Sequence, residues 1–177
     1  MAKTPTPEQA MFWLHDVLLP TLKVEQRTTK TVLEAVPADK GDYRPDPNAK
    51  SAMELVRHIA AAENRFLETV IVGKFDVNAA GIPENVKTSA EVAAWYTAQF
   101  EKNFEALTKL SGESLLRMVD FRGMFQRPAI SFLQLAMSHS IHHRGQLSTY
   151  LRPMGAKVPA IYGESYDSAQ AKKAAQA

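Results

Sequence analysis

Signals that start an α-helix recur four times along this 177-residue chain. A Ser or Thr followed three residues later by Glu or Gln forms a capping box, and Pro fits the first helical turn. Capping boxes begin at Thr6, Ser51 and Thr88, and Pro128 marks a fourth start. Apolar residues spaced by three and four positions follow these signals, without sustained strand-like alternation. The pattern predicts an all-α fold, a four-helix bundle with irregular connectors.

Stop signals set the expected ends of three of these helices. The first is expected to run to about Ala35, with a kink or a new cap near Leu19, because Pro20 cannot continue the backbone hydrogen bonds. The second ends around Gly73, and the fourth stops at Pro153.

Four segments are expected to lie outside the long helices. Residues 37–49 are rich in Pro and form a turn-rich linker, and residues 74–87 are irregular. Residues 115–126 contain the pair Arg122-Gly123 and predict a short hairpin or an extended connector. Residues 170–177 are expected to fray.

Length and composition are those of an ordinary globular protein. A chain of this length is most economically one domain, residues 1–177, with a core of about 6–155 and a C-terminal extension over 156–177. Hydrophobic residues make up 45% and charged residues 23%, which excludes a disordered or fibrous chain.

Charge and hydropathy exclude two classes of partner. The net charge is only +2, and Lys and Arg are scattered among Asp and Glu, so no nucleic-acid partner is expected. No segment reaches the roughly 18 apolar residues of a membrane span, and the first residues do not read as a secretory signal. A cytoplasmic location without a membrane partner is therefore expected.

Cysteine is absent from the chain. This excludes disulfides, thiolate metal ligands and a cysteine nucleophile. Any thiol chemistry must use an external thiol.

Three histidines on two predicted helices form the candidate metal site. His139 and His143 are four residues apart, so they lie on one face of the last helix about one turn from each other. His58 on the second helix could supply the third ligand. Imidazole suits zinc, nickel and similar divalent ions, and three protein ligands leave positions open for water or substrate. The alternative pair, His139 with His142, is also allowed by helical spacing.

The other histidines are interpreted differently. His142 is rotated about 100° from His143, so it is expected to lie near the site or at an interface without binding the ion. His15 follows Trp13 without a partner at ligand spacing and is interpreted as structural or surface-exposed.

Several polar neighbours have two possible roles. Glu54 lies one turn before His58 and either orients its ring or caps the helix. Gln146 and Arg144 either add polarity near the metal or brace the bundle. Position 140 is Ser, so the His-Glu-x-x-His pattern of zinc proteases is absent and proteolysis is not favoured.

The chain resembles the DinB/YfiT-like family of metal-dependent four-helix-bundle proteins. The resemblance rests on four motifs that span most of the chain in the expected order. They are Glu54-Leu-Val-Arg-His58-Ile-Ala-Ala-Ala-Glu63, the preceding Tyr43-Arg-Pro-Asp-Pro, His139-x-x-His142-His143-Arg144-Gly145-Gln146-Leu147, and Val158-Pro-Ala-Ile-Tyr162-Gly163.

The resemblance implies more than spacing does. It implies that His58, His139 and His143 bind a divalent metal, that the helices run up-down-down-up, and that the protein forms homodimers. Characterised relatives include transferases and isomerases that use low-molecular-weight thiols such as bacillithiol or mycothiol. The family name implies no DNA binding.

Three functions follow as hypotheses. The leading one is a metal-dependent thiol S-transferase, in which a bound divalent ion, zinc or nickel before manganese or iron, activates an external thiol toward a small electrophile. The second is a metal-dependent hydrolase that activates water. The third is a non-catalytic metal-binding, stress-related protein whose ion stabilises the bundle.

Overall fold

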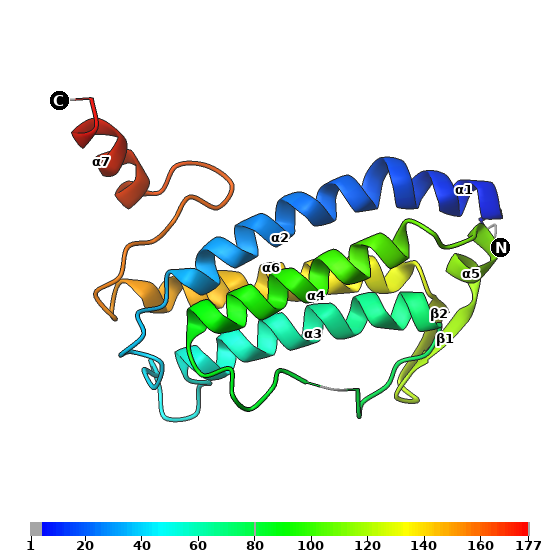
Figure 1. The fold of residues 1–177 in the computed structure, drawn as a ribbon, viewed down its shortest axis with the longest axis horizontal. Helices are drawn as coiled ribbons and strands as arrows, with labels where there is room; N and C mark the ends of the chain where they lie inside the picture. The colour runs from blue at the N-terminus through cyan, green and yellow to red at the C-terminus, as the bar shows by residue number, and fades with distance from the viewer. Residues whose placement is uncertain (1–4, 80, 177) are drawn as a thin grey trace.

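The computed structural model describes residues 5–79 and 81–176. Its elements in chain order are α1 (Pro7–Phe12), η1 (Trp13–Leu18), α2 (Leu19–Glu34), α3 (Ala52–Val72), α4 (Ser89–Leu107), α5 (Gly112–Leu116), β1 (Met118–Phe121), β2 (Phe125–Pro128), α6 (Ser131–Leu151) and α7 (Tyr166–Ala174). The long elements pack side by side as a helical bundle, as the sequence predicts (Figure 1).

The helices follow an up-down-down-up order. The continuous rod of α1, η1 and α2 runs in one direction, α3 and α4 both run in the opposite direction, and α6 returns (Figure 1). Helix α3 packs against α6 and α4, and α2 packs against the same two helices. Because α3 and α4 are parallel, the connector between them, described over residues 74–79 and 81–87, runs back along the bundle (Figure 1).

Two arginines of α3 hold this connector. Arg57 donates to the carbonyl oxygens of Val86 at 2.7 Å and Ile82 at 3.0 Å. Arg65 donates to the carbonyl oxygen of Ala79 at 3.3 Å. The irregular segment is thus fastened to the helix that precedes it.

The capping boxes form as the sequence predicts. At each of Thr6, Ser51 and Thr88, the hydroxyl accepts from the backbone N–H three residues on, and the Gln or Glu there accepts from the cap's own N–H. Gly73 ends α3 in the left-handed region with φ of 76°, where a side chain is strained. These local signals fix three helix starts and one helix end.

The first helical rod passes Pro20 without a new side-chain cap, so the re-cap expected near Leu19 does not form, and the helix changes there from π-helical to α-helical hydrogen bonding instead. Residues of η1 adopt π-helical bonding, and the N–H of Leu19 donates to the carbonyl of Leu14, five residues back. Proline offers no N–H, so a change of hydrogen-bond register next to it loses little. The hydroxyl of Thr21 donates to the carbonyl of Val17 at 2.7 Å.

The segment between α4 and α6 forms the hairpin that the sequence allowed. Strand β1 pairs antiparallel with β2, and the turn places Arg122 and Gly123 at positive φ. Pro128 closes the hairpin opposite Met118, so the expectation that Pro128 opens the last helix is wrong by three residues. A proline at the end of an edge strand is tolerated, because no hydrogen bond between the strands needs its missing N–H.

The C-terminal residues are more ordered than expected. Helix α7 covers most of the segment that was expected to fray from residue 170, and Ser165 caps it. Its residues are not buried. Capping and good helix formers, rather than packing, therefore account for this helix. Ala177 lies outside the described residues.

Two apolar clusters fill the bundle, with a polar layer between them. One cluster, around Leu14, Phe66 and Phe132, lies at the hairpin end. The other, around Leu55 and Tyr150, lies at the opposite end. The buried polar residues between them are Glu25, Gln26, Thr29, Glu63, Asn64, Ser140 and Arg144.

Candidate metal centre

The packing of α3 against α6 brings three histidines together. His58 comes from the second turn of α3, and His139 and His143 come from one face of α6. Each side chain is half-buried. We call His58, His139 and His143 the histidine cluster.

The ring nitrogens of this cluster converge. Nε2 of His58 lies 3.0 Å from Nε2 of His139 and 3.2 Å from Nε2 of His143. One ligand atom from each of the three residues lies within 4.8 Å of the others. The rings meet edge to face, with centroids 4.5–4.8 Å apart.

This spacing fits a shared cation. Two nitrogens bound to one ion at about 2.1 Å lie about 3.0–3.4 Å apart when the angle at the ion is about 90–110°. Three neutral imidazoles also supply the lone pairs that zinc, nickel, iron and manganese accept. The cluster can therefore hold a metal ion.

The surroundings favour the neutral form of two of the imidazoles, those of His58 and His139. Burial lowers the pKa of His58, and the charges of His143 and Lys50 lower it further. Burial also lowers the pKa of His139, to about 4, with contributions from the neighbouring histidines. Since protons compete with metal ions for imidazole nitrogen, these shifts favour metal binding near neutral pH.

Gln146 orients one ligand. Its side-chain oxygen lies 3.0 Å from Nδ1 of His143, and its amide nitrogen donates to the hydroxyl of Tyr150 at 3.3 Å. Tyr150 thereby fixes which way the amide points. With Nδ1 of His143 donating to Gln146, the lone pair on Nε2 faces the other two rings.

His139 has a different environment. Its Nδ1 is buried without a hydrogen-bond partner among the described residues. The ring packs edge-on against Phe66, with centroids 5.8 Å apart. Packing, rather than a hydrogen bond, holds this imidazole.

The remaining sequence candidates lie outside the cluster. His142 is exposed and meets the ring of His143 edge to face, with centroids 4.7 Å apart. The alternative pair of His139 with His142 is not the one that converges. His15 is exposed. Glu54 caps its own helix at Ser51 and pairs with Arg44 at 2.9 Å, so its alternative role as the orienting partner of His58 is not the one it takes.

Arg144 braces the bundle rather than entering the cluster. Its guanidinium is buried and pairs with the carboxylate of Glu25 at 2.8 Å. It also donates to the hydroxyl of Thr29 at 3.2 Å and to the hydroxyl of Tyr162. Tyr162 in turn donates to Glu25 at 2.9 Å. We call Arg144, Glu25, Thr29 and Tyr162 the arginine network.

A buried carboxyl lies in the same polar layer. The hydroxyl of Tyr96 donates to Oε1 of Glu63 at 2.6 Å, whereas Oε2 of Glu63 and the hydroxyl of Ser140 have no hydrogen-bond partner among the described residues. Burial raises the pKa of Glu63, and the hydrogen bond from Tyr96 and the charge of Arg144 act in the opposite direction. Burial and the charge of Glu63 raise the pKa of Tyr96.

Comparison with known proteins identifies the family. The sequence profile of the DinB family matches residues 11–175. The chain belongs to the DinB family.

Relatives of this DinB protein occur in bacilli. YjoA of Bacillus subtilis, an uncharacterized protein, is 35% identical over 136 residues, which is 73% of this chain and 84% of YjoA. YrdA of the same species, also uncharacterized, is 38% identical over 80 residues, 44% of this chain and 47% of YrdA.

Solved structures show the same fold. A crystal structure of the DinB-like YjoA aligns with a TM-score of 0.68 at 28% identity and covers 84% of this chain and 99% of that one. A DinB-like protein from Bacillus cereus aligns with a TM-score of 0.70 at 22% identity, covering 84% and 97%. No described helix of this DinB protein is long and apolar enough to cross a membrane.

Proposed function

We propose that this DinB protein binds one divalent metal ion through His58, His139 and His143. The observation that carries the proposal is the convergence of three Nε2 atoms at 3.0 and 3.2 Å on a half-buried seam. Zinc and nickel are favoured because imidazole binds both well, and manganese and iron are the alternatives.

We further propose that the site activates an external low-molecular-weight thiol for transfer to a small electrophile. A divalent ion, when bound, lowers the pKa of a coordinated thiol and so supplies a thiolate near neutral pH. The chain contributes three neutral ligands and leaves other coordination positions open. Since the chain has no cysteine, the sulfur comes from a cosubstrate.

The donor set separates this proposal from hydrolysis. Water activation at a metal works best with a general base next to the bound water, such as a carboxylate. The metal-holding group found among the described residues consists of three histidines without a carboxylate. A metal-dependent hydrolase is therefore the alternative. In it the metal ion alone would activate the bound water, without help from a protein carboxylate.

A non-catalytic role has one observation in its favour. The three ligands join α3 to α6, which pack against each other along the bundle, so a bound ion would stabilise the folded chain. Three ligands instead of a closed set of four favour the catalytic reading. We further propose that the protein is a single domain, forms homodimers and acts in the cytoplasm on a small molecule, without nucleic-acid or membrane partners.

Elemental analysis of tag-free protein purified without chelator tests the metal proposal, followed by reconstitution with zinc, nickel, manganese or iron. We expect one ion per chain. No bound ion under any condition would contradict the metal site and both enzyme hypotheses with it.

A second experiment separates the three functions. Metal-loaded protein is mixed with a chlorinated aromatic electrophile, with and without a small thiol. Consumption that requires both thiol and metal supports the transferase, and turnover without thiol supports the hydrolase. Chelation that lowers the melting temperature of an inactive protein supports the non-catalytic role.

A further inference from the structure

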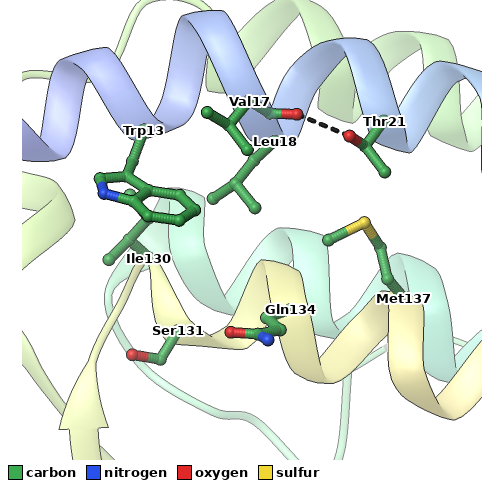
Figure 2. A pocket seen from close by; sticks show the side chains of 8 residues that line it. All are labelled: Trp13, Val17, Leu18, Thr21, Ile130, Ser131, Gln134 and Met137. Carbon is green, nitrogen blue, oxygen red and sulfur yellow. Dashed lines mark hydrogen bonds between the residues drawn. The ribbon is translucent and has the colours of Figure 1, made fainter.

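An open cavity lies on another side of α6. It has a volume of about 400 Å³ and is lined by η1, the start of α2, Ile130 and the first turns of α6. Figure 2 shows Trp13 and Leu18 of η1 facing Gln134 and Met137 of α6 across it. The histidine cluster contributes no residue to its lining.

Helical geometry separates the two sites. At about 100° per residue, Ser131, Gln134 and Met137 fall on the side of α6 opposite to His139 and His143. One side of α6 therefore faces α3 with the histidine cluster, and the other faces η1 with the cavity. We call this space the π-helix cavity.

The π-helical segment helps to form the cavity. A π-helical turn contains more residues than an α-helical turn, and such turns occur frequently at functional sites. Here the turn ends at Leu18 and holds Trp13, Val17 and Leu18 at the cavity wall. Trp13 is 53% exposed, so a large aromatic ring forms the cavity wall without being committed to the core.

The lining chemistry selects a type of ligand. None of the described residues that line the cavity carries an ionisable side chain. A charged ligand would lose water without gaining a counter-charge, which is costly. The indole of Trp13 and the thioether of Met137 favour a flat ring, and Ser131 and Gln134 offer one hydroxyl and one carboxamide.

We propose that the π-helix cavity binds a small, uncharged aromatic molecule with one hydrogen-bonding substituent. The volume lies near the small end of the range for ligand pockets, about 300–1,000 Å³, which suits a molecule of one or two rings. The ring packs against Trp13 and Met137, and the substituent binds Gln134. This site does not depend on the metal proposal.

Three isosteric probes test the charge argument: benzamide, benzoate and benzamidinium. Trp95→Phe leaves Trp13 as the sole tryptophan, so its fluorescence reports on the cavity, and ligand-observed NMR gives an independent measurement. We expect saturable binding of benzamide and at least about tenfold weaker binding of both charged probes. Equal binding of all three, or no saturable binding of benzamide, would overturn the proposal.

Thr21→Phe fills the cavity and has a matched control. Thr21 lies at the lip, and Thr31 lies on the same helix away from the cavity; each hydroxyl donates to the carbonyl four residues back. We expect Thr21→Phe to weaken benzamide binding at least about tenfold and Thr31→Phe to leave it unchanged. Should Thr21→Phe fail to fold, Gln134→Ala serves, with an expected loss of about fivefold.

Two further outcomes would contradict the proposal. If the chain self-associates and Thr21→Phe dissociates it while Thr31→Phe does not, a second copy covers the cavity and the ligand assignment is wrong. If His139→Ala abolishes benzamide binding, the cavity is not a separate site. Binding that survives His139→Ala supports the proposal, whether or not that variant binds metal.

Discussion

His143 and Arg144 are adjacent in the chain, yet they belong to polar regions of opposite character. The arginine network closes on itself, because Glu25, Thr29 and Tyr162 satisfy the guanidinium from three directions. In the histidine cluster three Nε2 atoms instead face one another without a carboxylate among them. A buried polar group that is fully paired stabilises the fold, whereas Nε2 atoms that converge on one point can bind a metal ion.

Replacing histidines of the cluster should give the largest effect, a complete loss of metal binding. His139→Ala and His143→Ala each remove one of three ligands, so we expect both to abolish stoichiometric metal binding, measured by elemental analysis after reconstitution. The exposed neighbour offers the control, and His142→Ala should leave binding largely intact. Equal loss from all three variants would contradict the ligand assignment.

Breaking the arginine network should lower the stability of the folded chain rather than its metal binding. Arg144→Ala leaves the carboxylate of Glu25 with little exposure and without its ion-pair partner, so we expect a loss of about 3–5 kcal/mol in urea unfolding. Lys30→Ala breaks the exposed pair with Glu34 and should cost about 0.3–0.5 kcal/mol. Similar losses from both variants would show that the buried pair has no special role.

Removing the support of one ligand should have an intermediate effect. Gln146→Leu takes away the oxygen that orients His143 while keeping a similar volume. We expect metal affinity to fall about 10–100-fold with the stoichiometry unchanged, measured by competition with a chelator. An unchanged affinity would mean that packing alone orients His143.

Glu63→Gln tests the buried carboxyl of the polar layer. The folded pKa of Glu63 is raised above its usual 4.5, so the folded chain binds more protons there, and stability falls as the pH rises through the folded pKa. The amide should accept from Tyr96 and donate to Ser140, and we expect a gain of about 0.5–1.5 kcal/mol at neutral pH. A gain that does not shrink on acidification would contradict this assignment.

The histidine cluster should show the opposite pH dependence. The folded pKa of His139 is about 4 against 6.5 for a free imidazole, so in metal-free protein the stability from the neutral ring is present above pH 6.5 and is lost as the pH falls toward 4. Melting temperatures of chelator-treated protein across this range measure the slope. His139→Gln should flatten the slope, and an identical slope in both proteins would assign it to another group.

Local signals account for most of the fold that the sequence predicts. Capping boxes at Ser51 and Thr88 fix helix starts because donor and acceptor lie three residues apart. Pro128 suits either a helix start or the end of an edge strand, and only its pairing with Met118 decides between them. The lost N–H of Pro20 permits the π-helical bonding before it, but the same loss also suits a kink or a new cap, so the sequence leaves the outcome open.

The part of the site on α6 could be predicted from the sequence, because its residues follow helical spacing. Spacing of four residues pairs His139 with His143, and spacing of three connects His143 to Gln146. Glu25 and Tyr162, which complete the arginine network, are 137 residues apart and meet only in the folded chain. Pairing over such a separation leaves no pattern in a single sequence.

The grip of α3 on the connector has a consequence for hydrogen exchange. Arg57 and Arg65 bind the carbonyl oxygens of Val86, Ile82 and Ala79, so this irregular segment is fastened to the helix that carries His58. Backbone amides near these carbonyls should therefore exchange with solvent together with those of α3, as one cooperative unit, rather than as a free loop. An event that loosens α3 at His58 should then also speed hydrogen exchange at the amides near Val86 and Ile82.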